Sequence, residues 1–541
     1  MEAIADVLMI LLAVVASTAI GKMLPVPIPL PLVQIVLGAA LAAFADLEVP
    51  LDPDIFFLLF IPPLLFLDGW RIPKQSLFRD AATCLELALG LVVFTVVGIG
   101  LFIHWMIPPI SLPVAFALAA VLSPTDPVAV SAITSRVPIP PRVMHILEGE
   151  SLLNDASGIV CMRVALAAAL TGTFSIVEAT GSFLWVALGG IVIGAAVTGV
   201  ITRAKYWVSR SFGEDTGAQI LVSLLIPFSA YLAAEHLHCS GILSAVAAGI
   251  TMSYAEISDQ AHGETRLQRT AVWNTVQVAL NGAIFVILGE QLPRILSGAF
   301  RAVRQAEHSE VWLLAIYVAA IAGALVALRL LWVWTSLRLT LYRAARQGVE
   351  RRAPPFRLVA AVSLAGVRGA ITLAGVLTFP LVTQDGSPFP ARDLAIFLAA
   401  GVIVLSLIVA SISLPRLLVD LPLPPEDRTS AELREIRATA AKSAIRAIQA
   451  AQHRLAEEDA DAKALEEAAS RALEVYGRRL EDVEGSGNAP DLIEMERQLR
   501  LAGLRAERQE IFRQAQSRMI NDALARRLIR ELDLAEARLA R

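Results

Sequence analysis

The chain has 541 residues, of which 56% are hydrophobic and only 18% are charged, and its mean hydropathy is +0.63. Soluble domains are usually about 45–50% apolar and about 25% charged, so this composition excludes an ordinary soluble protein. The formal net charge of −4 is close to neutral and gives no indication of a nucleic-acid partner. The three cysteines, Cys84, Cys161 and Cys239, lie in apolar surroundings without metal-ligand or redox spacing, and we interpret them as small core residues.

About thirteen apolar runs follow one another along the chain, and most are long enough to cross a bilayer. The first run has no basic segment ahead of it and no obvious cleavage site, so we interpret it as a membrane crossing rather than a removed signal peptide. The pattern predicts an all-α polytopic membrane protein with about 13 transmembrane helices. The runs lie near residues 4–20, 28–45, 55–70, 81–106, 113–135, 144–170, 181–202, 217–236, 241–255, 271–292, 311–338, 358–380 and 394–414.

Lysine and arginine residues gather in alternate loops, and this asymmetry predicts the orientation of the chain. Basic loops follow the third run at Arg71, the fifth at Arg136, the seventh at Arg203 and the eleventh at Arg343. The loops between them are acidic or neutral, and only the segment near residues 294–304 departs from the pattern. Because basic loops face the cytoplasm, we expect the N-terminus outside the cell and the C-terminus in the cytoplasm.

The composition changes abruptly after Pro425. The following residues are rich in Ala, Glu, Arg and Leu with helical spacing of the apolar positions, and the segment EGSGNAP at 484–490 interrupts this pattern. We therefore divide the chain into a membrane domain, residues 1–424, and a cytoplasmic helical tail, residues 425–541. The tail fits a solvated helical bundle or a dimer contact, and a ligand or pH sensor is the alternative.

The fifth run contains the segment Ser123-Pro-Thr-Asp-Pro127. Proline has no N–H and clashes with the preceding turn, so two prolines three residues apart interrupt a helix. In lipid, an interrupted backbone is tolerated only where it is buried in protein or lines a watery cavity, and transporters use such segments to hold ions near the middle of the membrane. Thr125 and Asp126 lie inside this break and are candidate ion-binding residues, with a simple structural kink as the alternative.

The sixth run contains Gly149-Glu-Ser-Leu-Leu-Asn-Asp155. A charge at bilayer depth costs roughly 2.5–3.5 kcal/mol on insertion scales, so a charged cluster at this depth indicates a function. On a helix, Ser151 and Asp155 lie four residues apart, as do Glu150 and Asn154, and the two pairs occupy neighbouring faces. An ionised carboxylate is a hard oxygen ligand for a cation and can hold a proton instead, so either ion displaces the other. The alternative is that these groups pair with arginines and only hold helices together.

Two arginines, Arg329 and Arg368, also lie within apolar runs, where a buried guanidinium needs a carboxylate or carbonyl partner. The glycines around Arg368 loosen the twelfth run or allow close approach, as the prolines interrupt the fifth. One loosened helix in each half of the chain is typical of inverted repeats. Asp68, near the end of the third run, lines a cytoplasmic funnel or lies at the membrane interface. Glu235 and Asn281 in later runs are weaker candidates for the same site.

Four segments occur in the order FIPPLLFLDGW at 60–70, SPTDPVA at 123–129, EGESLLND at 148–155 and GVRGA at 366–370. Together they resemble the sodium/proton antiporters of the monovalent cation:proton antiporter-1 family, on its bacterial branch. The resemblance covers roughly residues 5–420. It implies two inverted repeats of six helices with crossed, unwound helices, and a core domain that slides against a dimerisation domain. It also implies a homodimer.

The resemblance further implies the roles of the polar cluster. Asp155 is the carboxylate that binds the cation and the proton, and Ser151 and Thr125, with Asp126 beside it, belong to the same Na+ and proton site. Asn154 stands where electrogenic relatives in the wider superfamily have a second aspartate.

Other charged residues are implied to support this site. Glu150 pairs with Arg329, and Arg368 lies beside the crossed helices. Asp68 is shifted by one residue relative to the acidic residue of many animal relatives, which leaves its part as a funnel acid open.

These features predict a secondary antiporter that exchanges Na+, and Li+ with it, for H+ across a bacterial inner (plasma) membrane, electroneutrally and one for one, for pH and sodium homeostasis. Potassium/proton exchange by the same fold is the alternative. A cation channel needs a continuous pore lined by rings of charge or carbonyls, and interrupted helices around one buried carboxylate argue against it. An enzyme is not expected, because the sequence has no His cluster, Ser–His pair or phosphate loop. The implied partners are the transported ions, membrane lipid and a second copy of the chain, with no cofactor.

Overall fold

The computed structural model describes residues 2–23, 28–44, 53–72, 84–134, 141–172, 176–258, 263–305, 312–346, 354–383, 386–387, 389–419, 427–457, 462–484 and 489–517, with 528, 531–532 and 535–536. Its named elements are all helices. The chain forms two compact units, Met1–Leu421 and Pro422–Arg541. The boundary between them falls within a few residues of the change in composition after Pro425.

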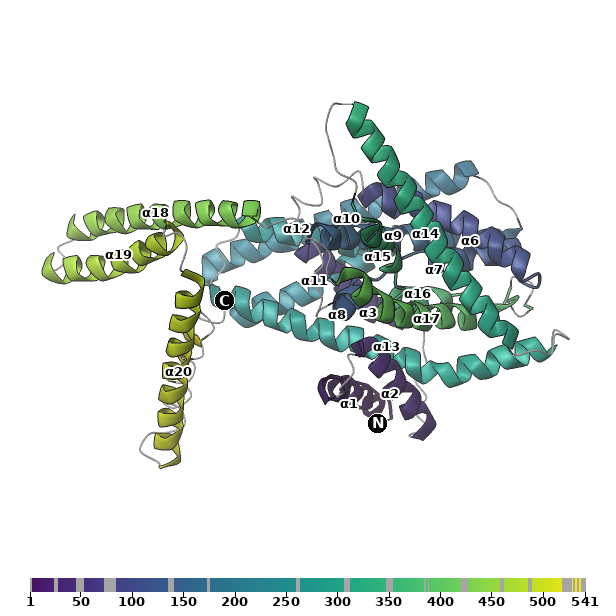
Figure 1. Ribbon diagram of the computed structural model, residues 1–541, viewed down its shortest axis with the longest axis horizontal. Helices are drawn as coiled ribbons and strands as arrows, with labels where there is room; N and C mark the ends of the chain where they lie inside the picture. Colours follow the sequence, from purple (N-terminus) through teal and green to yellow (C-terminus); the bar gives the residue numbers. More distant parts are fainter. Residues whose placement is uncertain are drawn as a thin grey trace. The chain divides into compact units, whose positions relative to one another are not determined.

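Each predicted apolar run coincides with a helix or with two consecutive short helices of the first unit (Figure 1). Within the described residues, eight helices are long and apolar enough to cross a membrane, while α2 and α7 are apolar but shorter. The predicted all-α membrane architecture is confirmed, and the number of crossings and the inverted repeats stay predictions. The elements are α1 (Glu2–Met23), α2 (Leu30–Phe44), α3 (Pro53–Arg71), η1 (Glu86–Leu91), α6 (Val92–Met106), α7 (Leu112–Leu122), α8 (Pro127–Thr134), α9 (Pro141–Thr171), α10 (Ile176–Phe212), α11 (Thr216–His236), α12 (Gly241–Ser258), α13 (Gly263–Gln305), α14 (Trp312–Arg346), α15 (Phe356–Leu364), α16 (Ala370–Leu377) and α17 (Arg392–Leu418).

Two of the runs are interrupted, and their breaks meet. Helix α7 ends at Leu122, before Pro124, and α8 begins at Pro127, as the proline spacing predicts. The twelfth run is more than loosened, because α15 and α16 are separate helices joined by residues 365–369. The backbone N–H of Asp126 donates to the carbonyl of Val367 at 2.8 Å. A Cβ on Gly369 would overlap the Asp126 carboxylate, so glycine is required for this approach.

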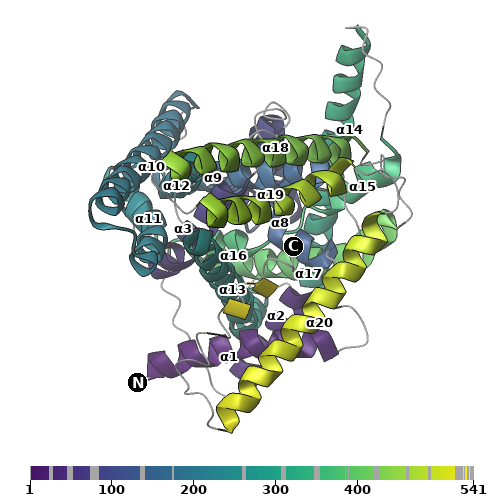
Figure 2. The ribbon, with the colours of Figure 1, turned by 90° about the vertical axis from the view of Figure 1, so that its left-hand side faces the viewer.

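The first unit contains two sets of packed helices. The interrupted-helix group consists of η1, α6–α9 and α14–α17, and the flanking group of α1–α3 and α10–α13. Figures 1 and 2 show α1 and α2 against α13, and α10, α11 and α12 side by side. Small residues permit close packing, as in membrane helices generally: Gly38 of α2 lies on the backbone of Val286 in α13, and Gly249 of α12 on the carbonyl of Phe66 in α3.

The second unit contains α18 (Asp427–Glu457), α19 (Ala462–Glu484) and α20 (Ala489–Gln516). Helices α18 and α19 pack on each other as a hairpin, with Ala441 and Ala469 buried. The predicted interruption at 484–490 corresponds to the end of α19 and the start of α20.

Candidate ion-binding site

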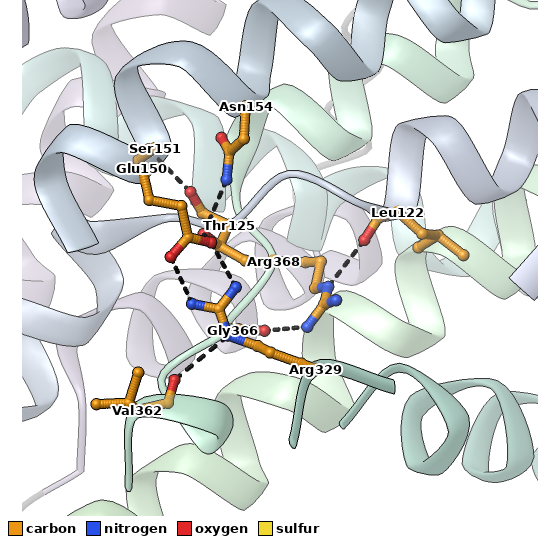
Figure 3. Close-up of polar contacts among 9 residues, drawn as sticks. All are labelled: Leu122, Thr125, Glu150, Ser151, Asn154, Arg329, Val362, Gly366 and Arg368. Atoms are coloured by element: carbon orange, nitrogen blue, oxygen red, sulfur yellow. Dashed lines mark hydrogen bonds and ion pairs between the residues drawn. The ribbon is translucent and has the colours of Figure 1, made fainter. Parts of the chain in front are cut away.

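The break between α7 and α8 is held against α9 at Thr125 (Figure 3). Ser151 Oγ donates to the Thr125 carbonyl at 2.9 Å, and Asn154 Nδ2 donates to Thr125 Oγ1 at 3.1 Å. Thr125 Oγ1 in turn donates to Glu150 Oε1 at 3.3 Å. All four side chains are buried. Three predicted residues of the sixth run therefore fix the interrupted backbone that the prolines of the fifth run create.

Asp155 lies one helical turn beyond Ser151 on α9 and lines a cavity of about 50 Å³ together with Thr125, Asp126 and Ser151. The Asp155 side chain is buried and makes no hydrogen bond within the described part of the chain. A single water needs roughly 10–15 Å³ of such space, so the cavity has room for a few waters or for one partly hydrated ion. Carboxylate, hydroxyl and carbonyl oxygens are the ligands that hard cations prefer.

Asp68 of α3 lines the same cavity. Three carboxylates, those of Asp68, Asp126 and Asp155, are close enough to interact electrostatically. Among the described residues no group of three or more His, Cys, Asp or Glu side chains has the geometry of a resident metal site. The three acids line one small cavity, and the part of Asp68 in ion passage stays a prediction.

Glu150 and Arg329 form a buried, bidentate ion pair. Arg329 Nη1 lies 2.5 Å from Glu150 Oε1 and Nη2 lies 2.7 Å from Oε2, with 1% of Glu150 and 3% of Arg329 exposed. Arg329 Nε also donates to the carbonyl of Val362 at 3.3 Å. Neither side chain lines the cavity. The pair lies behind Thr125 and joins α9 to α14 and α15, which makes it a support for the site rather than an ion ligand.

Arg368 joins the two breaks. Its Nε donates to the carbonyl of Leu122, the last residue of α7, at 2.9 Å, and its Nη1 donates to the carbonyl of Gly366 (Figure 3). Its backbone N–H donates to Ser406 Oγ of α17 at 3.2 Å. The carbonyls at the end of a helix lack partners within the helix and carry partial negative charge. A guanidinium at this point therefore satisfies the end of α7 and ties it to the α15–α16 break.

Asp126 caps the start of α8, since its Oδ1 accepts from the backbone N–H of Ala129 at 3.3 Å. Two other buried oxygens of this region, Ser123 Oγ and Asn154 Oδ1, have no hydrogen-bond partner among the described residues. Buried polar atoms are normally satisfied, so such exceptions are enriched where water or an ion binds.

Helix α13 contributes Asn281, a weaker candidate from the sequence, and Gln277, which the sequence did not indicate. Its Gln277 and Asn281 line the cavity, and Arg71 of α3 donates from Nη1 to Gln277 Oε1 at 2.7 Å and from Nη2 to Asn274 Oδ1 at 2.5 Å. These contacts join residues more than 200 positions apart, and no local pattern marks them. Glu235, the other polar residue noted in a later run, lies away from the cavity and pairs with Arg163 at 3.5 Å.

The fourth run also contains an unpredicted π-helical turn, η1. The Ser157 hydroxyl, two residues after Asp155, lies 2.8 Å from the carbonyl of Ala88 in this turn and 2.7 Å from that of Leu153. A π-helical turn leaves carbonyls displaced from the regular ladder, and such turns are frequent beside functional sites. This contact fixes α9 close to the candidate ion-binding carboxylate.

Comparisons with known proteins agree with this geometry. The family model "Sodium/hydrogen exchanger, transmembrane" matches residues 9–420. A protein of Escherichia coli K12, named as the uncharacterized Na+/H+ exchanger YjcE, is 42% identical over 545 residues, which is 99% of each chain. The sodium, potassium, lithium and rubidium/H+ antiporter of Bacillus subtilis is 42% identical over 414 residues, 76% of this chain and 60% of that one.

The fold also matches a solved structure, that of the sodium/proton antiporter MjNhaP1 from Methanocaldococcus jannaschii at pH 8. The match has a TM-score of 0.59 and 20% sequence identity, and it covers 78% of this chain and 99% of MjNhaP1. At this identity the match shows a common fold. With the family model spanning most of the chain, the family expected from the four sequence segments is confirmed. This multi-pass membrane protein belongs to the sodium/hydrogen exchanger family.

Proposed function

We propose that this protein is a secondary antiporter that exchanges Na+, and Li+ with it, for H+ in a ratio of one to one. The observation on which this rests is the buried carboxylate of Asp155 on the wall of a small cavity, beside the oxygens of Ser151 and Thr125. An ionised Asp155 attracts a cation, and a protonated Asp155 is neutral and releases it. Because one group serves both ions, binding of the proton and binding of the cation exclude each other.

The hydrogen bonds around Thr125 prepare oxygens for a cation. Ser151 uses its proton on the Thr125 carbonyl, so the lone pairs of Ser151 Oγ stay free to accept a cation. A carbonyl oxygen has two lone pairs, and Ser151 occupies only one of those on Thr125. Asp155, Ser151 and Thr125 therefore offer a carboxylate, a hydroxyl and a carbonyl oxygen, and cavity water completes the shell.

The exchange should be electroneutral. Asn154 cannot titrate, so of the two adjacent positions only Asp155 alternates between cation and proton. One proton exchanged for one monovalent cation moves no net charge, whereas a moved charge is worth about 2.3 kcal/mol per 100 mV. In reconstituted vesicles with a potassium–valinomycin potential, we expect the rate and end point of Na+/H+ exchange to be independent of that potential. A dependence on potential would refute one-to-one exchange and assign a second proton to Asp126 or Asp68.

Potassium/proton exchange is the second candidate, because the relative from Bacillus subtilis is named for sodium, potassium, lithium and rubidium. Oxygen ligands alone do not distinguish Na+ from K+, since cavity size and the number of ligands decide. Everted vesicles supplied separately with Na+, Li+, K+ and Rb+ test both candidates. Proton release driven by Na+ and Li+ but not by K+ supports the first, and release driven by K+ at least as strongly supports the second.

We also propose that the protein lies in a bacterial inner membrane, with its N-terminus outside the cell and its C-terminus in the cytoplasm. The end of helix α14 supports this orientation. The last turns of α14 carry Arg338 and Arg346, which lie over Trp334 and Tyr342 at 5.4 and 4.8 Å. Arginines beside aromatic rings are typical of a cytoplasmic membrane interface. A homodimer, with lipid around it, is part of the same proposal and rests on the family.

The helical tail should be dispensable for ion exchange. Every candidate ligand lies in the unit Met1–Leu421, and the tail forms a unit of its own. We expect a chain ending at Leu421 to retain cation-driven proton movement, with changes confined to expression, assembly or pH response. The measurement is pH recovery in vesicles containing equal amounts of truncated and full-length protein. Complete loss of turnover in a folded, inserted truncation would place part of the functional unit in the tail.

A further inference from the structure

One wall of the cavity is made by α13, a helix of the flanking group that supplies none of the cation ligands proposed above. Gln277 and Asn281 of this helix both line the cavity, as do Ser151 and Asp155 of α9. They are four residues apart and therefore lie on the same face of the helix. The two carboxamides add polar atoms to a lining that also includes side chains from α3 and α16.

The two carboxamides differ in what they bind. Gln277 Oε1 accepts a hydrogen bond from Arg71 Nη1, and the same guanidinium binds Asn274 Oδ1 one turn away. Arg71 therefore uses one of the two lone pairs of the Gln277 oxygen, and its guanidinium fixes this face of α13 to α3. Asn281, one turn further along, makes no hydrogen bond within the described part of the chain. A carboxamide at membrane depth is costly unless it is satisfied, and the cavity that Asn281 lines has room for the water or ion that would satisfy it.

We propose that the carboxamide oxygen of Asn281 is a further ligand of the transported monovalent cation, bound directly or through one cavity water. This inference rests on the proposed cation/proton exchange. A neutral oxygen adds to the coordination of the cation without adding a group that titrates, so it raises affinity and leaves the one-to-one ratio unchanged. The number and spacing of oxygens also set the preference among Na+, K+ and Li+. Asn281 is thus a specificity-determining residue, and Arg71 with Gln277 positions it.

Substitution of Asn281 by leucine, which has a similar size and no oxygen, tests this. We expect Asn281→Leu to raise the apparent KM for Na+ about tenfold, as loss of a contact to a charged group does, with a maximal rate close to that of the wild type. The ratio of the KM values for Na+ and K+ should change as well. Val278→Leu is the matched control, because Val278 lies on α13 with 52% of its side chain exposed and does not line the cavity.

Asn281→Asp is the second variant and keeps the shape of the side chain. A carboxylate at this point should lower the apparent KM for Na+ and make the exchange dependent on membrane potential. Unchanged KM values in both variants would overturn the inference, as would a reduced maximal rate at unchanged KM, which indicates a structural role. If the wild-type protein moves no protons in response to Na+, Li+, K+ or Rb+, the proposed function itself is wrong.

Discussion

Asp155→Asn should reduce cation-driven proton movement to the level of empty vesicles while leaving a folded protein. An asparagine side chain binds no proton at physiological pH and offers a cation a dipole in place of a charge, so both halves of the exchange are lost. The wild-type carboxylate is buried, makes no hydrogen bond among the described residues and lies near other carboxylates, and a buried charge in such surroundings is costly. The thermal unfolding temperature of the variant should therefore equal or exceed that of the wild type.

The measurement is sodium-driven pH recovery in liposomes that contain equal amounts of folded protein. Asp393→Asn is a matched control, since this acid lies exposed in the first turn of α17 and does not line the cavity. It should leave the rate unchanged. Wild-type pH recovery by Asp155→Asn would show that another group binds the ions, and Asp126 and Asp68 would be the next acids to substitute.

The parts of the site that could be predicted from the sequence are those in which a local pattern has a direct structural consequence. Proline removes a backbone N–H and clashes with the preceding turn, and the break at Ser123–Asp126 lies at two prolines that are three residues apart. Similarly, Ser151 and Asp155 share one face because four residues make about one helical turn. The structure brings both to one cavity with Thr125, as their spacing and the break suggested.

What depends on packing between distant helices could not be predicted. The sequence marks Arg71 only as a basic residue after an apolar run, which indicates orientation and nothing about its contact with Gln277 on α13. The sequence marks Asn281 only as a weaker candidate, and the folded chain brings it to the cavity that Asp155 lines. The twelfth run was expected to be loosened at its glycines. Its complete separation into α15 and α16 depends on the contact with the α7–α8 break, which is a tertiary interaction.

The pair of Glu150 and Arg329 should contribute to stability rather than to ion selection. Removal of one member strands the other charge in a buried site, which costs about 3–5 kcal/mol. Glu150→Gln and Arg329→Ala should each lower the thermal unfolding temperature substantially, and the double variant should be less damaged than the worse single variant. Because neither side chain lines the cavity, folded protein of each variant should keep the wild-type order of preference among Na+, Li+ and K+.

A second ion pair of the same unit provides the control for this cycle. Arg163 and Glu235 are separated by 3.5 Å, with 55% and 33% of their side chains exposed, and an exposed pair contributes only about 0–1 kcal/mol. Arg163→Gln should therefore change the unfolding temperature little, and its double variant with Glu235→Gln should be close to additive. Thermal unfolding in detergent measures both cycles. The bidentate geometry of Glu150 and Arg329 predicts a coupling energy well above that of the exposed pair. Strict additivity of their two substitutions would contradict this, because it would mean that neither charge depends on the other.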